Sequence, residues 1–240
     1  MAKIKNINMN QKYIIKVENL TKRYQGKKVL GPINFTIKKG EKVAIIGANG
    51  SGKTTLCEII ANLKNPTRGN IKYGFPSKKL GNLLSINFQE QNYPSTLIVQ
   101  DLIDFYHAVY KSNQKQSELW KTFDISPLLT KKIIKLSGGQ RQRLNLYLSL
   151  FYQPQIFIGD EITTGLDIQT KIEVINFLKK QTSEREMTLI LVSHHWDEII
   201  SLCSRVILLN KGSLIDDATP GRIEKQYNSL LNYYQNKIKL

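Results

Sequence analysis

A glycine-rich stretch at residues 47–55, GANGSGKTT, separates an apolar run at 43–46 from a helical pattern at 56–61. A strand, a glycine-rich turn and Gly-Lys-Thr at the start of a helix form the context of a phosphate-binding P-loop. The glycines let the backbone curl until its N–H groups point inward, at the positive end of the following helix. Lys53 adds a full charge there, and the Thr54 hydroxyl is placed to bind Mg²⁺. The stretch predicts a nucleotide site made of Gly47, Asn49, Gly50, Ser51, Gly52, Lys53, Thr54 and Thr55.

A second glycine motif, LSGGQ at residues 136–140, precedes another helical pattern. Ser137 can cap a helix that starts at Gly138, and Gln140 stands at the third position of a capping box. The two glycines leave the first turn without side chains, so the anion-binding end of this helix is open to solvent. Taken alone, each motif has a simpler alternative: a glycine-rich turn in another α/β protein, or an ordinary capped helix.

Together the two motifs resemble the ATP-binding-cassette (ABC) family, whose signature motif is this pentapeptide, and the resemblance spans about residues 13–220. In that family two such domains meet head to tail. Each ATP then lies between the P-loop of one subunit and the signature motif of the other. The resemblance implies that Ser137, Gly138, Gly139 and Gln140 contact a nucleotide bound to a second subunit.

Residues 156–161, IFIGDE, form an apolar run that ends in two carboxylates, and they are similar to the Walker B strand of the family. Buried carboxylates are costly unless they meet a cation or hydrogen-bond donors. The resemblance assigns Asp160 to Mg²⁺, through its waters, and makes Glu161 the general base for the attacking water. A carboxylate pair that merely caps the next helix is the alternative.

This strand departs from the family at two positions. The family usually has a bulky apolar residue where Gly159 stands and a proline where Ile162 stands. We expect Gly159 to leave a gap behind the carboxylates and Ile162 to loosen the turn. The expected consequence is a changed rate of hydrolysis with unchanged residue roles.

Two further strand ends match family motifs in the expected order. Gln89 ends an apolar run at the position of the Q-loop, where it would sense Mg²⁺ and the attacking water, and Gln91 is a rival two residues on. His194 stands at the position of the switch histidine, which contacts the γ-phosphate in the family. His195 follows it, and we expect that side chain to be structural.

Asp167 and Tyr24 complete the predicted site. Asp167 lies in the D-loop, which in the family crosses the dimer interface, and Gly165 replaces the usual alanine of that loop. We expect the glycine to make the loop more flexible. Tyr24 stands where the family has an aromatic ring that stacks on adenine. A surface tyrosine that packs on its own sheet is the alternative.

The predicted fold is α/β, a P-loop NTPase core with a mainly parallel sheet. Segments at 43–46, 155–158, 188–192 and 205–209, whose cores are continuous apolar runs, predict strands buried on both faces. Short β-type runs at 13–42 predict an N-terminal antiparallel β subdomain, and residues 92–140 an inserted helical subdomain. Residues 1–12 are expected to be a mobile extension. Thr219-Pro220 opens a final helix, which places a C-terminal helix at 221–240.

An apolar stripe marks the first helix of the inserted subdomain: Ile98, Leu102, Phe105, Tyr106 and Val109 recur at helical spacing. We expect most of it to be internal core. In the family, a groove of this subdomain receives a cytoplasmic helix of the transmembrane partner. We expect that groove to involve residues 89–96.

The chain is strongly basic, with 35 lysines and arginines, 19 acidic residues and a formal net charge of +16. This charge can indicate nucleic acid or an anionic membrane surface, and a solvated lysine-rich surface is an equal alternative. The aromatics and glycine loops of an RNA-binding module are absent around the lysines, so we expect no nucleic-acid partner. Cys57 and Cys203 lie in apolar patterns, which predicts buried thiols in a reducing compartment.

No run approaches 18 uninterrupted apolar residues, and the N-terminus lacks the apolar core of a signal peptide. We therefore expect a cytoplasmic protein, peripheral on the inner face of the cell membrane through a partner. The resemblance implies the ATP-hydrolysing subunit of an ABC transporter, with ATP and Mg²⁺ as cofactors. Its partners would be a transmembrane permease and a second ABC ATPase subunit, in a homodimer or a heterodimer.

The direction of transport rests on the helical subdomain. Only 48 positions separate Gln89 from Ser137, which looks most similar to the compact exporter branch, so we expect export over import. A soluble ABC ATPase of a cytosolic assembly system, such as iron–sulfur cluster assembly, is the alternative function.

Overall fold

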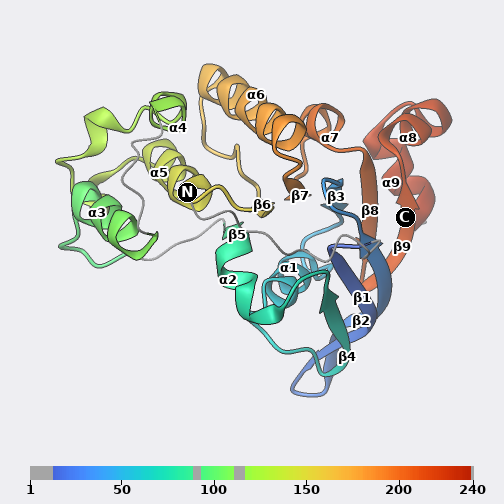
Figure 1. Cartoon of the computed structure of the whole chain (residues 1–240). Coiled ribbons are helices and arrows are strands. Elements are labelled where there is room, and N and C mark those ends of the chain that lie inside the picture. Colours follow the sequence, from blue (N-terminus) through green and yellow to red (C-terminus); the bar gives the residue numbers. More distant parts are fainter. Residues whose placement is uncertain (1–12, 89–92, 111–116, 239–240) are drawn as a thin grey trace.

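The computed structural model describes residues 13–88, 93–110 and 117–238, and its strands form two sheets (Figure 1). Three strands pair antiparallel in the order β2-β1-β4: β1 (Ile15–Tyr24), β2 (Lys27–Ile37) and β4 (Arg68–Tyr73). Residues 1–12, which we expected to be a mobile extension, lie outside the described part of the chain. The antiparallel sheet confirms the predicted N-terminal β structure.

One detail of that prediction is wrong, because the third strand, β4, comes from outside residues 13–42. Strand β2 continues through Gly31 and Pro32, a dipeptide that is typical of a turn. The ladder shifts register at this point, because Leu20 pairs with Ile33 and Lys22 with Leu30. Proline is tolerated in a strand at such an irregularity, since its nitrogen is not needed for a ladder hydrogen bond.

The second sheet has the order β5-β6-β7-β3-β8-β9, and all neighbours run parallel except β8 and β9. Its strands are β3 (Lys42–Ile46), β5 (Leu84–Asn87), β6 (Ile156–Asp160), β7 (Thr188–Val192), β8 (Arg205–Asn210) and β9 (Ser213–Ala218). Alternate residues of a strand enter different cores: Val43 and Ile45 face one, Ala44 and Ile46 the other. Burial on both faces is why these strands are continuous apolar runs, as predicted.

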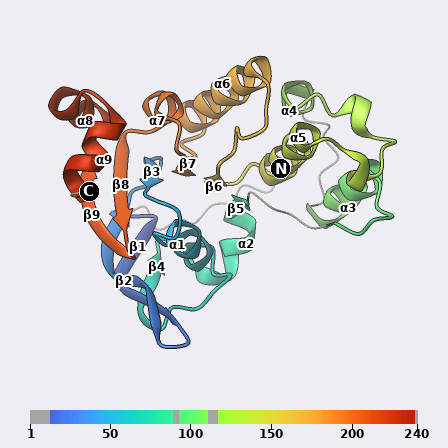
Figure 2. The ribbon, with the colours of Figure 1, turned by 180° about the vertical axis from the view of Figure 1, so that it is seen from behind.

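Helices cover both faces of this sheet (Figures 1 and 2). Helix α1 (Lys53–Ile60) follows the P-loop and packs in the core shared with the antiparallel sheet. Helices α6 (Ile168–Glu184) and α7 (Trp196–Leu202) pack in the core on the opposite face. Cys57 and Cys203 are buried free thiols, one in each core.

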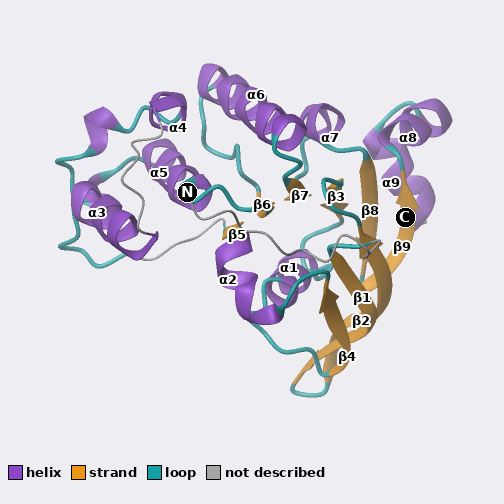
Figure 3. Ribbon diagram, in the orientation of Figure 1, coloured by secondary structure: helices purple, strands orange, loops and turns teal. Residues whose placement is uncertain are grey.

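Three helices of the predicted insertion and of the segment that follows it lie at the β5 edge of the sheet, apart from the antiparallel strands (Figure 3). They are α3 (Val99–Tyr110), α4 (Ser117–Thr122) and α5 (Gly138–Leu150), with 3₁₀ turns at Ser126–Leu128 and Ile133–Lys135. A 3₁₀ turn at Ser77–Lys79 and helix α2 (Leu80–Leu83) precede β5.

The apolar stripe of α3 is only partly core. Leu102 is buried, but Phe105 is 61% exposed and Val109 54% exposed, so the prediction of an internal stripe is wrong for these two. The buried side of α3 is instead formed by Val99, Leu102 and Ile103. A helix packed against one neighbour buries a narrow stripe, and its helical periodicity does not show where that stripe ends.

Two helices, rather than one, end the described chain. Thr219 caps α8 (Pro220–Tyr227) as predicted, by accepting a hydrogen bond from the backbone N–H of Arg222. Asn228 then adopts a left-handed conformation (φ 59°), which ends the helix before α9 (Leu230–Ile238). None of the helices that the structure describes is both long and apolar enough to cross a membrane.

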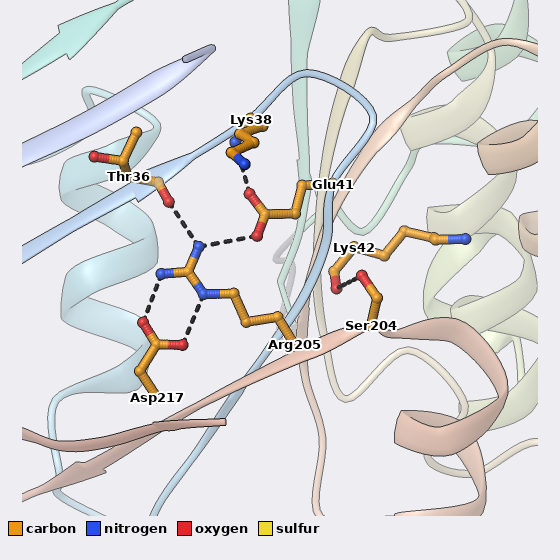
Figure 4. A network of polar contacts seen from close by, with 7 residues as sticks. All are labelled: Thr36, Lys38, Glu41, Lys42, Ser204, Arg205 and Asp217. Carbon is orange, nitrogen blue, oxygen red and sulfur yellow. Dashed lines mark hydrogen bonds and ion pairs between the residues drawn. The ribbon is translucent and has the colours of Figure 1, made fainter. Parts of the chain in front are cut away.

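Arg205 joins the two sheets (Figure 4). Its guanidinium donates to the Thr36 carbonyl oxygen of β2 at 2.7 Å and to Glu41 at 2.9 Å. It also makes a bidentate pair with Asp217 of β9, with distances of 2.7 and 2.6 Å. The Asp217 hydrogen bonds are the main cause of a raised pKa for Arg205. The Asp217 pair lies within the P-loop sheet and orients the guanidinium, whose bond to the Thr36 carbonyl links that sheet to β2 of the antiparallel sheet.

Candidate active site

The P-loop wraps around the Lys53 ammonium. Lys53 begins α1, and its Nζ donates to the carbonyl oxygens of Gly47 at 2.8 Å and Ala48 at 3.1 Å. A pocket of about 440 Å³ opens above it, lined by Val29, Asn49, Gly50, Gly52, Lys53, Thr54, Thr55, Asp160 and Glu161. The structure thus brings together most of the residues predicted from the P-loop and the Walker B strand.

This loop fits a phosphate group. Gly52 has φ 101°, and a Cβ there would lie 2.5 Å from Leu30 Cδ2, so only glycine leaves the loop backbone in this conformation. The Ser51 hydroxyl is buried and has no hydrogen-bond partner among the described residues. A buried polar atom without a partner is costly, although Ser51 itself does not line the pocket. Helix α1 starts in the pocket at Lys53, and its first backbone N–H groups have no partner within the helix, so they can donate to a phosphate.

Asp160 ends β6 beside the P-loop. The Thr54 hydroxyl donates to Asp160 Oδ2 at 3.1 Å. Burial raises the pKa of the Asp160 carboxyl, and the Thr54 hydrogen bond opposes this. Burial also lowers the pKa of Lys53, which the two nearby carboxylates oppose. A hydroxyl and a carboxylate in contact supply the oxygen ligands that Mg²⁺ prefers, so the site fits both the ion and the phosphates.

Glu161 and His194 follow the neighbouring strands β6 and β7. His194 Nε2 lies 3.2 Å from Glu161 Oε1. The Glu161 backbone is left-handed (φ 50°), and its N–H donates to the Val192 carbonyl oxygen at 2.9 Å. Non-glycine residues held in this conformation are common at functional sites. The arrangement points both side chains toward one place beyond the strand ends, where a base and its orienting partner would be needed.

The expected gap behind the carboxylates does not exist. The Ile162 side chain is fully buried, and its Cγ2 would lie 2.4 Å from a Cβ at position 159. Gly159 and Ile162 therefore complement one another, and the prediction of a gap is wrong. The carbonyl oxygen of Ile162 also accepts a hydrogen bond from Gln142 of α5 at 2.9 Å, which ties the turn to the signature helix.

We expect Gly159→Ala to lower the free energy of unfolding by about 1–3 kcal/mol, because the added methyl overlaps Ile162. Ile162→Ala should cost about 2–4 kcal/mol on its own. The double variant should lose about 1 kcal/mol less unfolding free energy than the two single losses added together, since Ile162→Ala makes room for the new methyl. Urea unfolding of the four proteins measures this coupling, and additive effects would contradict the complementary packing.

The signature motif caps α5 as predicted. Gln140 N–H donates to Ser137 Oγ, and Ser137 N–H donates to Gln140 Oε1, both at 3.2 Å. Ser137 and Gly138 are exposed, Gly139 is half-buried, and none of them lines the P-loop pocket of this chain. A Cβ at Gly139 would lie 2.8 Å from the Gly165 carbonyl oxygen. The signature helix therefore begins against the D-loop of its own chain, with its N-terminus open to solvent.

Two predicted site residues, Asp167 and Tyr24, do not line the pocket. Asp167 caps α6 by accepting from the Thr170 N–H at 2.9 Å and hydroxyl at 2.7 Å, and these bonds lower the pKa of its carboxyl. Tyr24 is 40% exposed, and the Lys22 and Lys64 ammonium groups lie 4.9 and 5.8 Å from its ring centroid. Gln89 and its rival Gln91 lie outside the described residues.

His195 is exposed, and its backbone N–H donates to Ser193 Oγ at 3.0 Å. The structural role expected of its side chain stays a prediction. The residue that sequence reasoning missed is Glu198, which is fully buried beside Ser193. An acidic residue in the first turn of a helix is typical of simple helix-dipole stabilisation. The sequence therefore carries no signal that Glu198 contacts Thr163 and Ser193, in the loops of Glu161 and His194.

The fold and this site define a P-loop ATPase: a glycine-rich phosphate loop beside an Asp-Glu pair at the end of a buried parallel strand. A family model described as ABC transporter matches residues 30–164. The chain belongs to the ABC transporter family, as an ATP-binding subunit with ATPase activity. The family binds ATP.

Individual relatives agree with this assignment. The nickel import system ATP-binding protein NikE of Staphylococcus aureus (strain MRSA252) is 35% identical over 90% of this chain and 93% of its own. The linearmycin resistance ATP-binding protein LnrL of Bacillus subtilis (strain 168) is 29% identical over 84% of this chain and 68% of its own. The solved dimeric structure of the ATP-binding cassette MJ0796 bound to ADP and Pi has a TM-score of 0.75 and 26% identity, covering 86% of this chain and 98% of that one.

Proposed function

We propose that this chain works as one half of an ATPase dimer that drives a separate transmembrane subunit. The observation that carries the proposal is that one chain supplies only part of the predicted nucleotide site. The P-loop, Asp160, Glu161 and His194 converge within the chain, whereas the N-terminus of the signature helix is capped, exposed and absent from that pocket. A second subunit, either a copy of this chain or a related one, would bring its signature motif to the nucleotide.

Within this proposal each residue has a distinct task. Lys53 and the loop N–H groups would bind the phosphates, and Thr54, Asp160 and the undescribed Gln89 would hold Mg²⁺. The ion, when bound, supplies positive charge against the phosphate oxygens. Glu161 would accept the proton of the attacking water, and His194 at 3.2 Å would hold the carboxylate and contact the γ-phosphate. His194 lies beside Glu161 already, so little rearrangement of this pair is required.

Two peripheral residues extend the proposal. Tyr24 would stack on adenine, since its ring is 40% exposed at the end of β1. The two lysines beside the ring would have to move off one face for a base to stack there. Asp167 would act from the D-loop at the dimer interface, through the loop geometry that its cap on α6 sets. Both roles remain predictions.

The compact helical subdomain and the named relatives differ in the transport direction that they favour. The compact helical subdomain favours export, whereas NikE, at 35% identity, belongs to a nickel import system and LnrL to linearmycin resistance. We keep export as the prediction and treat metal import as the second candidate. Location on the inner face of the membrane, through the permease, is part of the same proposal.

Two measurements test this function. Affinity purification of the tagged chain from detergent-solubilised membranes should recover a polytopic membrane protein, whereas a soluble scaffold in its place would favour the cytosolic-assembly alternative. Deletion of the gene should leave the uptake of radioactive Ni²⁺ unchanged if the chain serves an exporter. Loss of that uptake, restored by the parental chain but not by Lys53→Ala, would establish import instead.

A further inference from the structure

Glu198 is a charged residue with no contact with solvent. It lies in the first turn of α7 and is 0% exposed. Oε1 accepts a hydrogen bond from the Thr163 hydroxyl and lies 3.0 Å from Lys171 Nζ, and Oε2 accepts from the Ser193 hydroxyl at 2.8 Å. Three separate segments therefore meet on one carboxylate.

The three partners make this burial possible. An isolated buried carboxylate is strongly unfavourable, and pairing with a cation and hydrogen-bond donors offsets the cost. Lys171 supplies the charge from α6 and also lies 3.2 Å from Asp197. Burial alone would lower the pKa of Lys171, but its hydrogen bonds to Glu198 and Asp197 raise it. Both oxygens of Glu198 have partners, so the carboxylate has one well-defined orientation.

Two of the three partners of Glu198 lie close in sequence to Glu161 and His194. Thr163 is two residues after Glu161, and Ser193 directly precedes His194. Neither loop is fixed by the sheet beyond this point, because the pairing of β6 with β7 ends at Asp160 and Val192. Past the sheet, the Glu161 N–H still donates to the Val192 carbonyl oxygen. The Glu198 carboxylate links the same two loops one or two residues further along, through Thr163 and Ser193.

We propose that Glu198 is a positioning residue for hydrolysis, which holds the loops of Glu161 and His194 together through Thr163 and Ser193. It is absent from the residues that line the P-loop pocket, so it acts through its neighbours rather than on the nucleotide. The proposal rests on the proposed roles of Glu161 and His194. A small displacement of a reacting group lowers the rate far more than it changes binding.

The test removes single hydrogen bonds and changes little else. Thr163→Val and Ser193→Ala delete one hydroxyl each, and Glu198→Gln removes the charge while keeping the shape. We expect kcat for ATP hydrolysis to fall by about 10- to 100-fold in each variant, with the KM and the affinity for ATP within about twofold of the parent. Thr182→Val is the matched control: Thr182 is also buried, but among the described interactions its hydroxyl donates to the Lys179 carbonyl oxygen of its own helix alone.

Combining Thr163→Val with Ser193→Ala should cost little more than Glu198→Gln alone, because all three changes loosen the same contact. Should Glu198→Gln fail to fold, the two hydroxyl variants carry the test by themselves. Parental kcat in folded Thr163→Val and Ser193→Ala would overturn the positioning role, as would an equal loss of kcat in Thr182→Val. Parental turnover in Glu161→Gln would instead refute the proposed role of Glu161, so the two failures are distinguishable.

Discussion

Replacing Glu161 with glutamine is expected to reduce ATP turnover by at least about 100-fold while leaving the affinity for ATP nearly unchanged. The amide has the same shape as the carboxylate but cannot accept the proton of the attacking water. In the proposed site, phosphate binding would depend instead on Lys53, the loop N–H groups and the Thr54–Asp160 contact. Turnover is measured by phosphate release, and affinity by equilibrium binding of ATP.

The same variant should accumulate an ATP-bound dimer, seen as a doubled mass in size-exclusion chromatography with ATP. Glu173→Gln is the matched control, since Glu173 is exposed on α6 and bonds only to Gln169 among the described interactions. It should hydrolyse ATP at the parental rate. A folded Glu161→Gln protein that does the same would show that Glu161 is not the base.

Two nearly inactive variants, Lys53→Ala and Ser137→Arg, should recover ATPase activity when they are mixed. Lys53→Ala removes the charge that binds the phosphates, and Ser137→Arg obstructs the exposed end of α5. A mixed dimer keeps one intact site, formed by the Lys53 of one chain and the signature motif of the other. At equal amounts and random exchange, about one quarter of all sites are intact, so recovery should approach about one quarter of the parental rate if sites act independently.

The double variant Lys53→Ala/Ser137→Arg is the control for this mixture, because neither single variant can complete a site with it. Activity is followed against the mixing ratio, and cross-linking of differently tagged chains verifies that mixed dimers form. If mixed dimers form without activity, either the site lies within one chain or hydrolysis needs both sites. Substantial ATPase activity of the Ser137→Arg protein by itself would show that the site lies within one chain.

The motifs themselves were predictable because each depends on local chemistry. The glycines of the P-loop, the apolar run before Asp160 and the serine before Gly138 each dictate the conformation of a few adjacent residues, and the structure has all three. The parallel sheet was equally predictable, since continuous apolar strands bury both faces. Spacing along the chain then supplied their order.

Contacts between distant segments were not predictable in this way. Gly159 suggested a missing side chain, and only the fold shows that Ile162 fills the space. Phe105 and Val109 fit a helical stripe, and only the packing of α3 leaves them exposed.

Glu198 shows the difference between what the sequence and what the tertiary structure determine. Its sequence context indicates an ordinary acidic residue in the first turn of a helix, and nothing local places it beside Thr163, which lies 35 residues away. The sequence by itself determined the nucleotide chemistry, because phosphate-binding loops and strand-end carboxylates are local features. The tertiary structure alone decided which side chains keep the site residues in position, because parallel strands bring together loops that are remote along the chain.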